Sequence, residues 1–264
     1  MALAVCLATS APAQVFLSGG TYSQNFDTLA ASGTGNAWVN NTTLPGWYAD
    51  RGTNGPLNTY NAGTGSSTTG SLYSFGSATA SSDRALGSLA SNTTSNLTYG
   101  VRLHNDTLNS LQDFTVSYTG EQWRNNNNAN AQTLQFSYQT SGSAITSADA
   151  LNAPGSGGWI AFNTLDFTSP VHTTVSAALD GNASANRTVF SGAVLTGVVL
   201  NPGDELFLRW FDPNDSGNDH GLGIDDLSVS FTVTPVPEPR EFAAVAALGL
   251  LGFAAYRRRS SSRA

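Results

Sequence analysis

The densest group of side chains that could do chemistry is acidic. Five aspartates fall within the fifteen residues from Asp212 to Asp226, among asparagines and glycines. Carboxylate, amide and carbonyl oxygens are the ligands that calcium takes, about six to eight at a time. The order of residues follows the start of a calcium-binding loop, but the twelfth position is Gly223 in place of a bidentate glutamate. Two readings stay open, a hydrogen-bonded turn or a calcium site with the ligands Asp212, Asn214, Asp215, Asp219, Asp225 and Asp226.

Two tryptophans follow residues that are typical of turns or of binding surfaces. Trp123 stands beside Glu121, Gln122 and Arg124, and Trp47 follows the turn sequence Leu44-Pro45-Gly46. An exposed indole can stack on a sugar ring while polar neighbours bind its hydroxyls. The other reading places both indoles in the core and makes Glu121 a buried acid paired with an arginine, Arg124 or Arg209. The sequence therefore offers Trp47 and Trp123 as a carbohydrate platform, with a structural role as the alternative.

No catalytic residue is assigned. A polysaccharide hydrolase needs two facing carboxylates, and Glu121 with Asp106 or Asp226 is the pair that the sequence offers. The three histidines are isolated from one another, and the chain has no serine-nucleophile, phosphate-binding or dinucleotide motif. We expect a protein that is not an enzyme.

Composition excludes further classes of function. Charged residues make up 11% of the 264 residues, every positive side chain is arginine, and the net charge is −7. A nucleic-acid-binding protein needs a clustered basic surface, so nucleic acid is excluded as a partner. Cys6 is the only cysteine, which excludes a disulfide framework.

The elements that must position these side chains are strands. Apolar residues alternate with polar or small ones over 97–103, 114–118, 134–138 and 227–233. The Asn201-Pro202-Gly203-Asp204 turn predicts that the apolar runs on either side of it, 195–200 and 206–211, pair as a hairpin. We expect an all-β chain, an antiparallel jelly-roll-like β-sandwich forming a single domain over 14–235, with one C-terminal hydrophobic helix.

Both ends of the chain have the pattern of processing segments. Residues 1–13 are mostly apolar and end in Ala11-Pro12-Ala13, the small-residue pattern that precedes a signal-peptidase cut before Gln14. No basic residue precedes the apolar run, so we interpret 1–13 as a signal peptide that is truncated at its start. At the other end Val236-Pro237-Glu238-Pro239 precedes an apolar stretch, 242–256, and then the cluster Arg257, Arg258 and Arg259.

The order of these three C-terminal parts, over 236–264, resembles the PEP-CTERM sorting signal of Gram-negative bacteria. The resemblance implies a transmembrane helix over 242–256 with an arginine-rich tail, recognition by exosortase-type machinery, and removal of the helix. It also implies a transient anchor in the inner membrane and final release to the cell envelope or the exterior. Blocks between Thr43 and Ser230 resemble exported β proteins that carry the same signal, a group defined by sorting and not by an activity.

The sequence thus predicts an exported envelope or extracellular-matrix protein, structural or associated with exopolysaccharide, without catalysis. The alternative is a carbohydrate-binding module stabilised by calcium. A polysaccharide hydrolase is the third reading.

Overall fold

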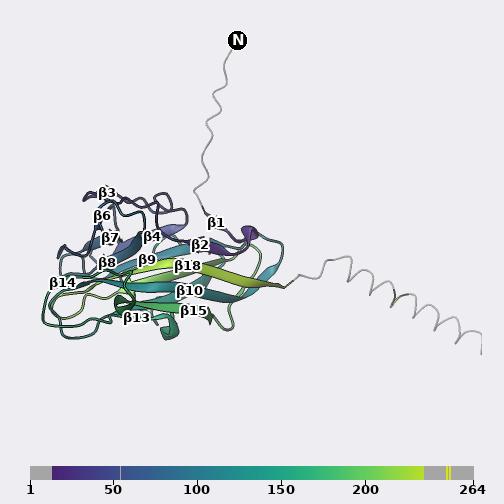
Figure 1. Cartoon of the computed structure of the whole chain (residues 1–264). Coiled ribbons are helices and arrows are strands. Elements are labelled where there is room, and N and C mark those ends of the chain that lie inside the picture. Colours follow the sequence, from purple (N-terminus) through teal and green to yellow (C-terminus); the bar gives the residue numbers. More distant parts are fainter. Residues whose placement is uncertain (1–13, 54, 235–247, 249, 251–264) are drawn as a thin grey trace, which may run out of the picture.

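The chain folds into two large β-sheets that pack face to face, as the computed structural model in Figure 1 shows. The structure describes residues 14–53, 55–234, 248 and 250. The predictions for 1–13 and 236–264, which include the sorting residues Val236, Pro237, Glu238, Pro239 and Arg257 to Arg259, lie outside these residues, as does nearly all of the helix expected over 242–256. Within the described part of the chain, no helix has the length and hydropathy that a membrane span needs.

The first sheet has eight strands. Its main order is β12-β11-β17-β9-β4-β5, with β1 added to β9 and β13 added to β11. The bounds are β1 (Val15–Phe16), β4 (Trp47–Arg51), β5 (Gly55–Pro56), β9 (Leu97–His104), β11 (Thr133–Ser141), β12 (Ile160–Ala161), β13 (Phe167–Thr168) and β17 (Glu205–Asp212).

The second sheet has ten strands. Its main order is β14-β10-β18-β8-β7-β6-β3, with β15 and β16 added to β10 and β2 added to β18. The bounds are β2 (Tyr22–Gln24), β3 (Asn36–Ala37), β6 (Thr59–Gly63), β7 (Ser71–Phe75), β8 (Ala85–Leu89), β10 (Ser110–Asn125), β14 (Ala177–Ala178), β15 (Arg187–Val194), β16 (Val199–Leu200) and β18 (Gly221–Thr234). Three short 3₁₀ helices lie between strands of the described chain, η1 (Leu17–Gly19), η2 (Asn163–Leu165) and η3 (Ser184–Asn186).

The core lies between the two sheets and is rich in aromatic rings. Trp210 of β17 packs edge to face against Tyr118 of β10, with 5.4 Å between ring centroids, so this pair joins one sheet to the other. Trp47 of β4 stacks on Trp210 at 6.1 Å. Burial of several large rings at one place provides much of the apolar area that stabilises a sandwich of this size.

The prediction of an all-β chain is confirmed, and the alternating runs form β9, β10, β11 and β18. The sheets are not purely antiparallel as predicted, because β1 pairs with β9 and β6 pairs with β7 in parallel. The jelly-roll class itself stays a prediction.

The hairpin predicted around Pro202 is wrong in its pairing. The turn forms, with the Asp204 amide donating to the Asn201 carbonyl at 3.0 Å and Gly203 at φ +88°. However, β16 pairs with β10 in the ten-stranded sheet, whereas β17 pairs with β9 and β11 in the eight-stranded sheet. Turn residues determine how tightly the chain reverses, but the apolar faces on each side determine which sheet each strand joins.

Candidate functional site

The outer face of the ten-stranded sheet, the one turned away from the core, has an apolar cluster of its own. Tyr73 and Phe75 of β7 stack at 4.8 Å, and Phe75 stacks on Trp123 of β10 at 5.8 Å. The rings can lie flat because the strands between them have glycine at Gly87 and Gly223, which present no side chain. The result is a row of three aromatic rings across four strands.

Two buried carboxylic acids share this face with the aromatic row. Glu121 lies two residues before Trp123 on β10, and side chains two apart on a strand point the same way. Asp225 of β18 lies directly across from Thr119 of β10. Thr119 is two residues before Glu121, so the side chains of Thr119 and Glu121 point the same way. Glu121 and Asp225 are therefore diagonal neighbours on one face of the sheet. Their residues are 2% and 4% exposed. A buried acid is costly unless it is protonated or has a partner.

The groups around the two acids are mostly acidic as well. Asp83 and Asp226 are exposed and raise the pKa of both buried acids, whereas Arg187, opposite Glu121 on β15, lowers that of Glu121. Burial is the larger cause and raises the pKa of Glu121 to about 7 and that of Asp225 to about 9. The Trp123 indole opposes part of this by donating to Glu121 Oε2 at 3.1 Å. At neutral pH the pair therefore holds at least one proton.

Each buried acid has an oxygen that is free to bind something else. Glu121 Oε1 and Asp225 Oδ2 accept no hydrogen bond from any described residue, while Asp225 Oδ1 accepts from the Asp226 amide at 2.7 Å. Asp226 also lines a hollow of about 400 Å³. The other residues of its lining are nearly all polar: Ser23, Gln24, Asn25, Leu227 and Ser228.

Hydroxyl-rich molecules suit this arrangement, which we call the acidic face and define by Asp83, Glu121, Asp225, Asp226 and Arg187. An ionised carboxylate accepts hydrogen bonds only, while a protonated one both donates and accepts. Amide and hydroxyl side chains in the adjacent hollow add donors and acceptors of both kinds. The acidic face with its hollow can therefore bind several hydroxyl groups at once.

The platform prediction for Trp47 and Trp123 needs correction. Their residues are 0% and 1% exposed, and Gly181 lies directly against the Trp123 ring. Trp47 packs between Phe26 and Trp210, and its indole donates to the Tyr22 hydroxyl at 2.8 Å. A sugar cannot stack on either ring in this structure, so both indoles have the structural role that was the alternative.

The six residues predicted to bind calcium do not form one site. Asp212, Asn214, Asp215 and Asp219 lie at or after the end of β17, whereas Asp225 and Asp226 belong to the acidic face on β18. The Asp212 carboxylate is buried, accepts from the Ser88 hydroxyl at 2.7 Å and has its pKa raised by burial. No three acidic, histidine or cysteine side chains of the described residues are close enough to hold one metal ion.

The loop after β17 is instead held by hydrogen bonds, as in the other reading of the sequence. Asp219 Oδ1 accepts from the Asp215 amide at 2.8 Å. The Asn128 amide group donates to the carbonyls of Ser216 and Asn218, both at 3.0 Å. These bonds hold the turn, although the side-chain oxygen of Asn214 is buried without a partner among the described residues.

The sequence pointed to Glu121 as a candidate site residue, but it did not point to Asp225 as its neighbour. Glu121 is not paired with Arg124 or Arg209, whose guanidinium groups donate to backbone carbonyls and to neutral side chains. Asp106, one of the two carboxylates offered as its partner in a hydrolase, accepts from Ser18 instead. Asp226 does lie near Glu121, and Asp225 was missed in this role. The alternation of β18 places Asp225 on the outer face, but only the register with β10 places it beside Glu121.

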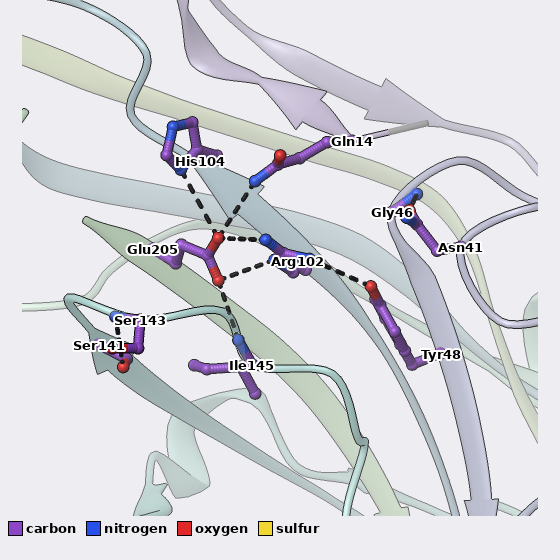
Figure 2. A network of polar contacts seen from close by, with 10 residues as sticks. All are labelled: Gln14, Asn41, Gly46, Tyr48, Arg102, His104, Ser141, Ser143, Ile145 and Glu205. Atoms are coloured by element: carbon purple, nitrogen blue, oxygen red, sulfur yellow. Dashed lines mark hydrogen bonds and ion pairs between the residues drawn. The ribbon is translucent and has the colours of Figure 1, made fainter. Parts of the chain in front are cut away.

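The outer face of the eight-stranded sheet is closed by the segment 142–159. Figure 2 shows its anchor, Glu205, which accepts from Gln14 at 3.1 Å, from Arg102 Nε at 2.7 Å and from the Ile145 amide at 3.0 Å. Hydrogen bonds to Glu205 raise the pKa of Arg102. Farther along the same sheet, the Arg209 guanidinium lies 3.8 Å from the centroid of the Trp159 ring. These contacts hold the segment in place, so this face has a structural role.

Comparison with known proteins gives a distant likeness to sandwich proteins. No protein-family model and no curated protein matches the chain. Among solved structures, a family 11 carbohydrate-binding module from Clostridium thermocellum, in complex with a mixed-linked β-1,3-1,4 tetrasaccharide, is similar over 75% of this chain and 95% of its own, with 8% identity and a TM-score of 0.32. A family 28 module specific for non-crystalline cellulose is similar over 76% and 96%, with 12% identity and a TM-score of 0.31. Scores of this size carry no inference about a ligand.

Proposed function

We propose that the protein binds polysaccharide through the acidic face and the adjacent hollow, without catalysis. One observation carries this proposal: Asp226 lines a polar hollow of about 400 Å³ and lies on the sheet face of Glu121 and Asp225, each of which has an oxygen that accepts from no described residue. Neither oxygen belongs to the fully buried atoms that lack a partner, so both reach the surface, where ligand hydroxyl groups can donate to them in place of water.

A glycan fits the dimensions and the chemistry of this surface. The hollow and the acids span β2, β18 and β10, so a chain of several sugar units can contact all three strands. Sugar hydroxyls donate to the carboxylates and accept from the amide groups of Gln24 and Asn25.

Affinity electrophoresis against a panel of soluble polysaccharides, with glycan-array binding alongside, tests the proposal. We expect retention by at least one polysaccharide, weakened about tenfold in Asp226→Asn, which removes a charge from the wall of the hollow. Asp113→Asn is the matched control, because Asp113 is also exposed and also has a positive φ, 52° against 51° for Asp226.

An equal loss of retention in Asp226→Asn and Asp113→Asn would mean that only the net charge of the protein matters. The absence of retention by every polysaccharide would contradict the proposal. Release of reducing ends, abolished in Glu121→Gln, would instead assign the same carboxylates to a polysaccharide hydrolase. We expect no such release.

We also propose that the protein is exported and sorted through a PEP-CTERM signal, so that binding takes place in the cell envelope or the extracellular matrix. The support is the order of parts in the sequence over 1–13 and 236–264. A polysaccharide ligand is consistent with that location.

A further inference from the structure

We infer that the sandwich has a second ligand site, at the end where several of its loops meet, and that this site takes a single neutral sugar unit. The site is a hollow of about 240 Å³, which we call the end hollow. No residue of its lining belongs to the acidic face or to the hollow beside Asp226, so the inference goes beyond the proposed function and does not depend on it. The lining comes mainly from the connections β6–β7, β8–β9, β10–β11 and β17–β18 and includes Thr68, Asn92, Asn126, Asn218 and Asp219.

Asp219 gives the end hollow a hydrogen-bond acceptor. The residue is only 4% exposed, yet it lines the hollow. Its Oδ1 accepts from the Asp215 amide at 2.8 Å, which holds the carboxyl group in place, while its Oδ2 accepts from no described residue. Oδ2 is not among the fully buried atoms that lack a partner, so it reaches the hollow that the residue borders. A ligand hydroxyl can donate to it there.

Asn126 gives the same hollow a hydrogen-bond donor. The residue is 6% exposed and also belongs to the lining. Arg124 Nε donates to its Oδ1 at 2.9 Å, and this bond fixes which end of the amide is the oxygen. The nitrogen Nδ2 donates to no described residue and is not a fully buried atom without a partner. Because Arg124 is itself held by the carbonyls of Gly65 and Ser66, the donor is positioned before a ligand arrives.

An ionised carboxylate oxygen that only accepts and an amide nitrogen that only donates suit neighbouring groups that can do both, and adjacent sugar hydroxyls are such groups. Asn92 adds a further donor, since its Oδ1 accepts from the Asn214 amide group at 3.1 Å and its Nδ2 has no described partner. The volume lies below the roughly 300 to 1,000 Å³ of pockets for drug-sized ligands. The end hollow therefore has room for one sugar ring, either a free monosaccharide or the last unit of a glycan.

A sugar fits the end hollow better than a metal ion does. Asp219 is the one acidic residue of the described lining. No three acidic, histidine or cysteine side chains in the described part of the chain are close enough to share a metal ion. The Asn126 nitrogen is a donor, whereas calcium takes oxygen ligands.

Saturation-transfer NMR of the full chain at about pH 7.5, with free glucose, galactose or mannose and a calcium chelator, tests the inference. At this pH Asp219 is mainly ionised, since burial raises its pKa to about 6. We expect at least one of these sugars to bind with a dissociation constant in the millimolar range. The affinity is modest because no aromatic ring of the described residues lines the hollow, so hydrogen bonds have to hold the sugar.

Two isosteric changes reverse the polarity of the end hollow. Asp219→Asn keeps an oxygen for the Asp215 amide and replaces the free acceptor by a donor. Asn126→Asp keeps an oxygen for Arg124 and replaces the free donor by an acceptor. We expect each change to weaken binding at least about tenfold. The double variant again has one donor and one acceptor, so we expect it to bind more tightly than either single variant.

Asn127→Asp is the matched control for charge. Asn127 is exposed and does not line the end hollow, although it lies next to Asn126 in the chain. We expect its affinity to stay within about twofold of that of the wild type. Asn92→Asp, at an exposed residue, removes a donor and serves as the test if Asp219→Asn fails to fold.

The other outcomes separate this inference from the proposed function. No binding of any of the sugars would overturn the inference, and so would an equal loss in Asn127→Asp. A loss in Asp226→Asn without a loss in Asp219→Asn would place the sugar in the hollow of the proposed function instead. Binding that appears only when calcium chloride replaces the chelator would make Asp219 a metal ligand and overturn the inference. Sugar binding that is lost in Asp219→Asn, with no polysaccharide retained by the protein, would support the inference and contradict the proposed function alone.

Discussion

At the scale of residues, the buried pair Glu121 and Asp225 couples the stability of the protein to pH. Both acids have a higher pKa in the folded state than their ordinary values of 4.5 and 3.8. The folded state therefore holds protons that the unfolded chain releases, and the resulting stability is fully present below about pH 4. It is lost as the pH rises through about 7 for Glu121 and about 9 for Asp225.

Glu121→Gln tests this coupling, because a glutamine can still accept from the Trp123 indole but cannot ionise. We expect little change in stability near pH 5 and a gain of about 3 kcal/mol near pH 9, because Glu121, whose pKa burial raises to about 7, is ionised in the folded state only at the higher pH. Denaturant unfolding at the two pH values measures it. A gain of the same size at both pH values would mean that ionisation is not the cause.

At the scale of elements, the acidic face depends on how closely β8 approaches β18. A Cβ atom at Gly87 would lie 2.4 Å from the Leu222 carbonyl oxygen and 2.8 Å from Phe75 Cδ2. Backbone atoms cannot yield as a flexible side chain does, so the two strands and the aromatic row would have to separate.

We therefore expect Gly87→Ala to lower the free energy of unfolding by about 1 to 3 kcal/mol and to weaken the near-ultraviolet circular dichroism of the stacked rings. Gly19→Ala is the control, because a Cβ atom there meets nothing within 4 Å and Gly19 does not have a positive φ. Thermal unfolding of both variants measures the difference. Equal midpoints would show that β8 has room to move.

Strand alternation and strand register explain how much of the fold and of the candidate site the sequence can predict. Alternation identified β9, β10, β11 and β18, because one buried face leaves a period of two in the sequence. It also marks which side chains of a strand share a face. Alternation does not give the register between strands. Only the structure therefore shows that Glu121 and Asp225 are neighbours. It also shows that β16 and β17 belong to different sheets. The burial of Trp47 and Trp123 likewise depends on partners distant in the chain.

At the scale of the whole molecule, the outer faces of the two sheets differ in what covers them. The eight-stranded sheet is covered by the segment that Glu205 helps to hold, while the ten-stranded sheet carries the acidic face and its hollow. Five of the eleven arginines lie after residue 239, so the part before them is more acidic than the net charge of −7. The hollow and the two carboxyl oxygens without a protein donor both belong to the ten-stranded sheet.

The cuts predicted at the two ends of the chain leave the described strands intact. The first described residue is Gln14, whose side chain donates to Glu205 at 3.1 Å, and the last strand ends at Thr234, two residues before Val236. Cleavage before Gln14 and after the Pro-Glu-Pro motif therefore removes no described strand. We expect mature protein from the native envelope or matrix to begin at Gln14 and to lack 242–256.

Mass spectrometry of both ends, on protein fractionated from its own cells, measures this outcome, and a recombinant chain without sorting machinery is the control that retains 242–256. The thermal midpoint of the processed form should equal that of the full chain, since each end is cut outside the sandwich. Full-length protein in the cytoplasmic fraction would contradict export, whereas an intact C-terminus in the envelope would contradict removal of the helix alone. Because the acidic face belongs to the sandwich, either form should bind the same glycan.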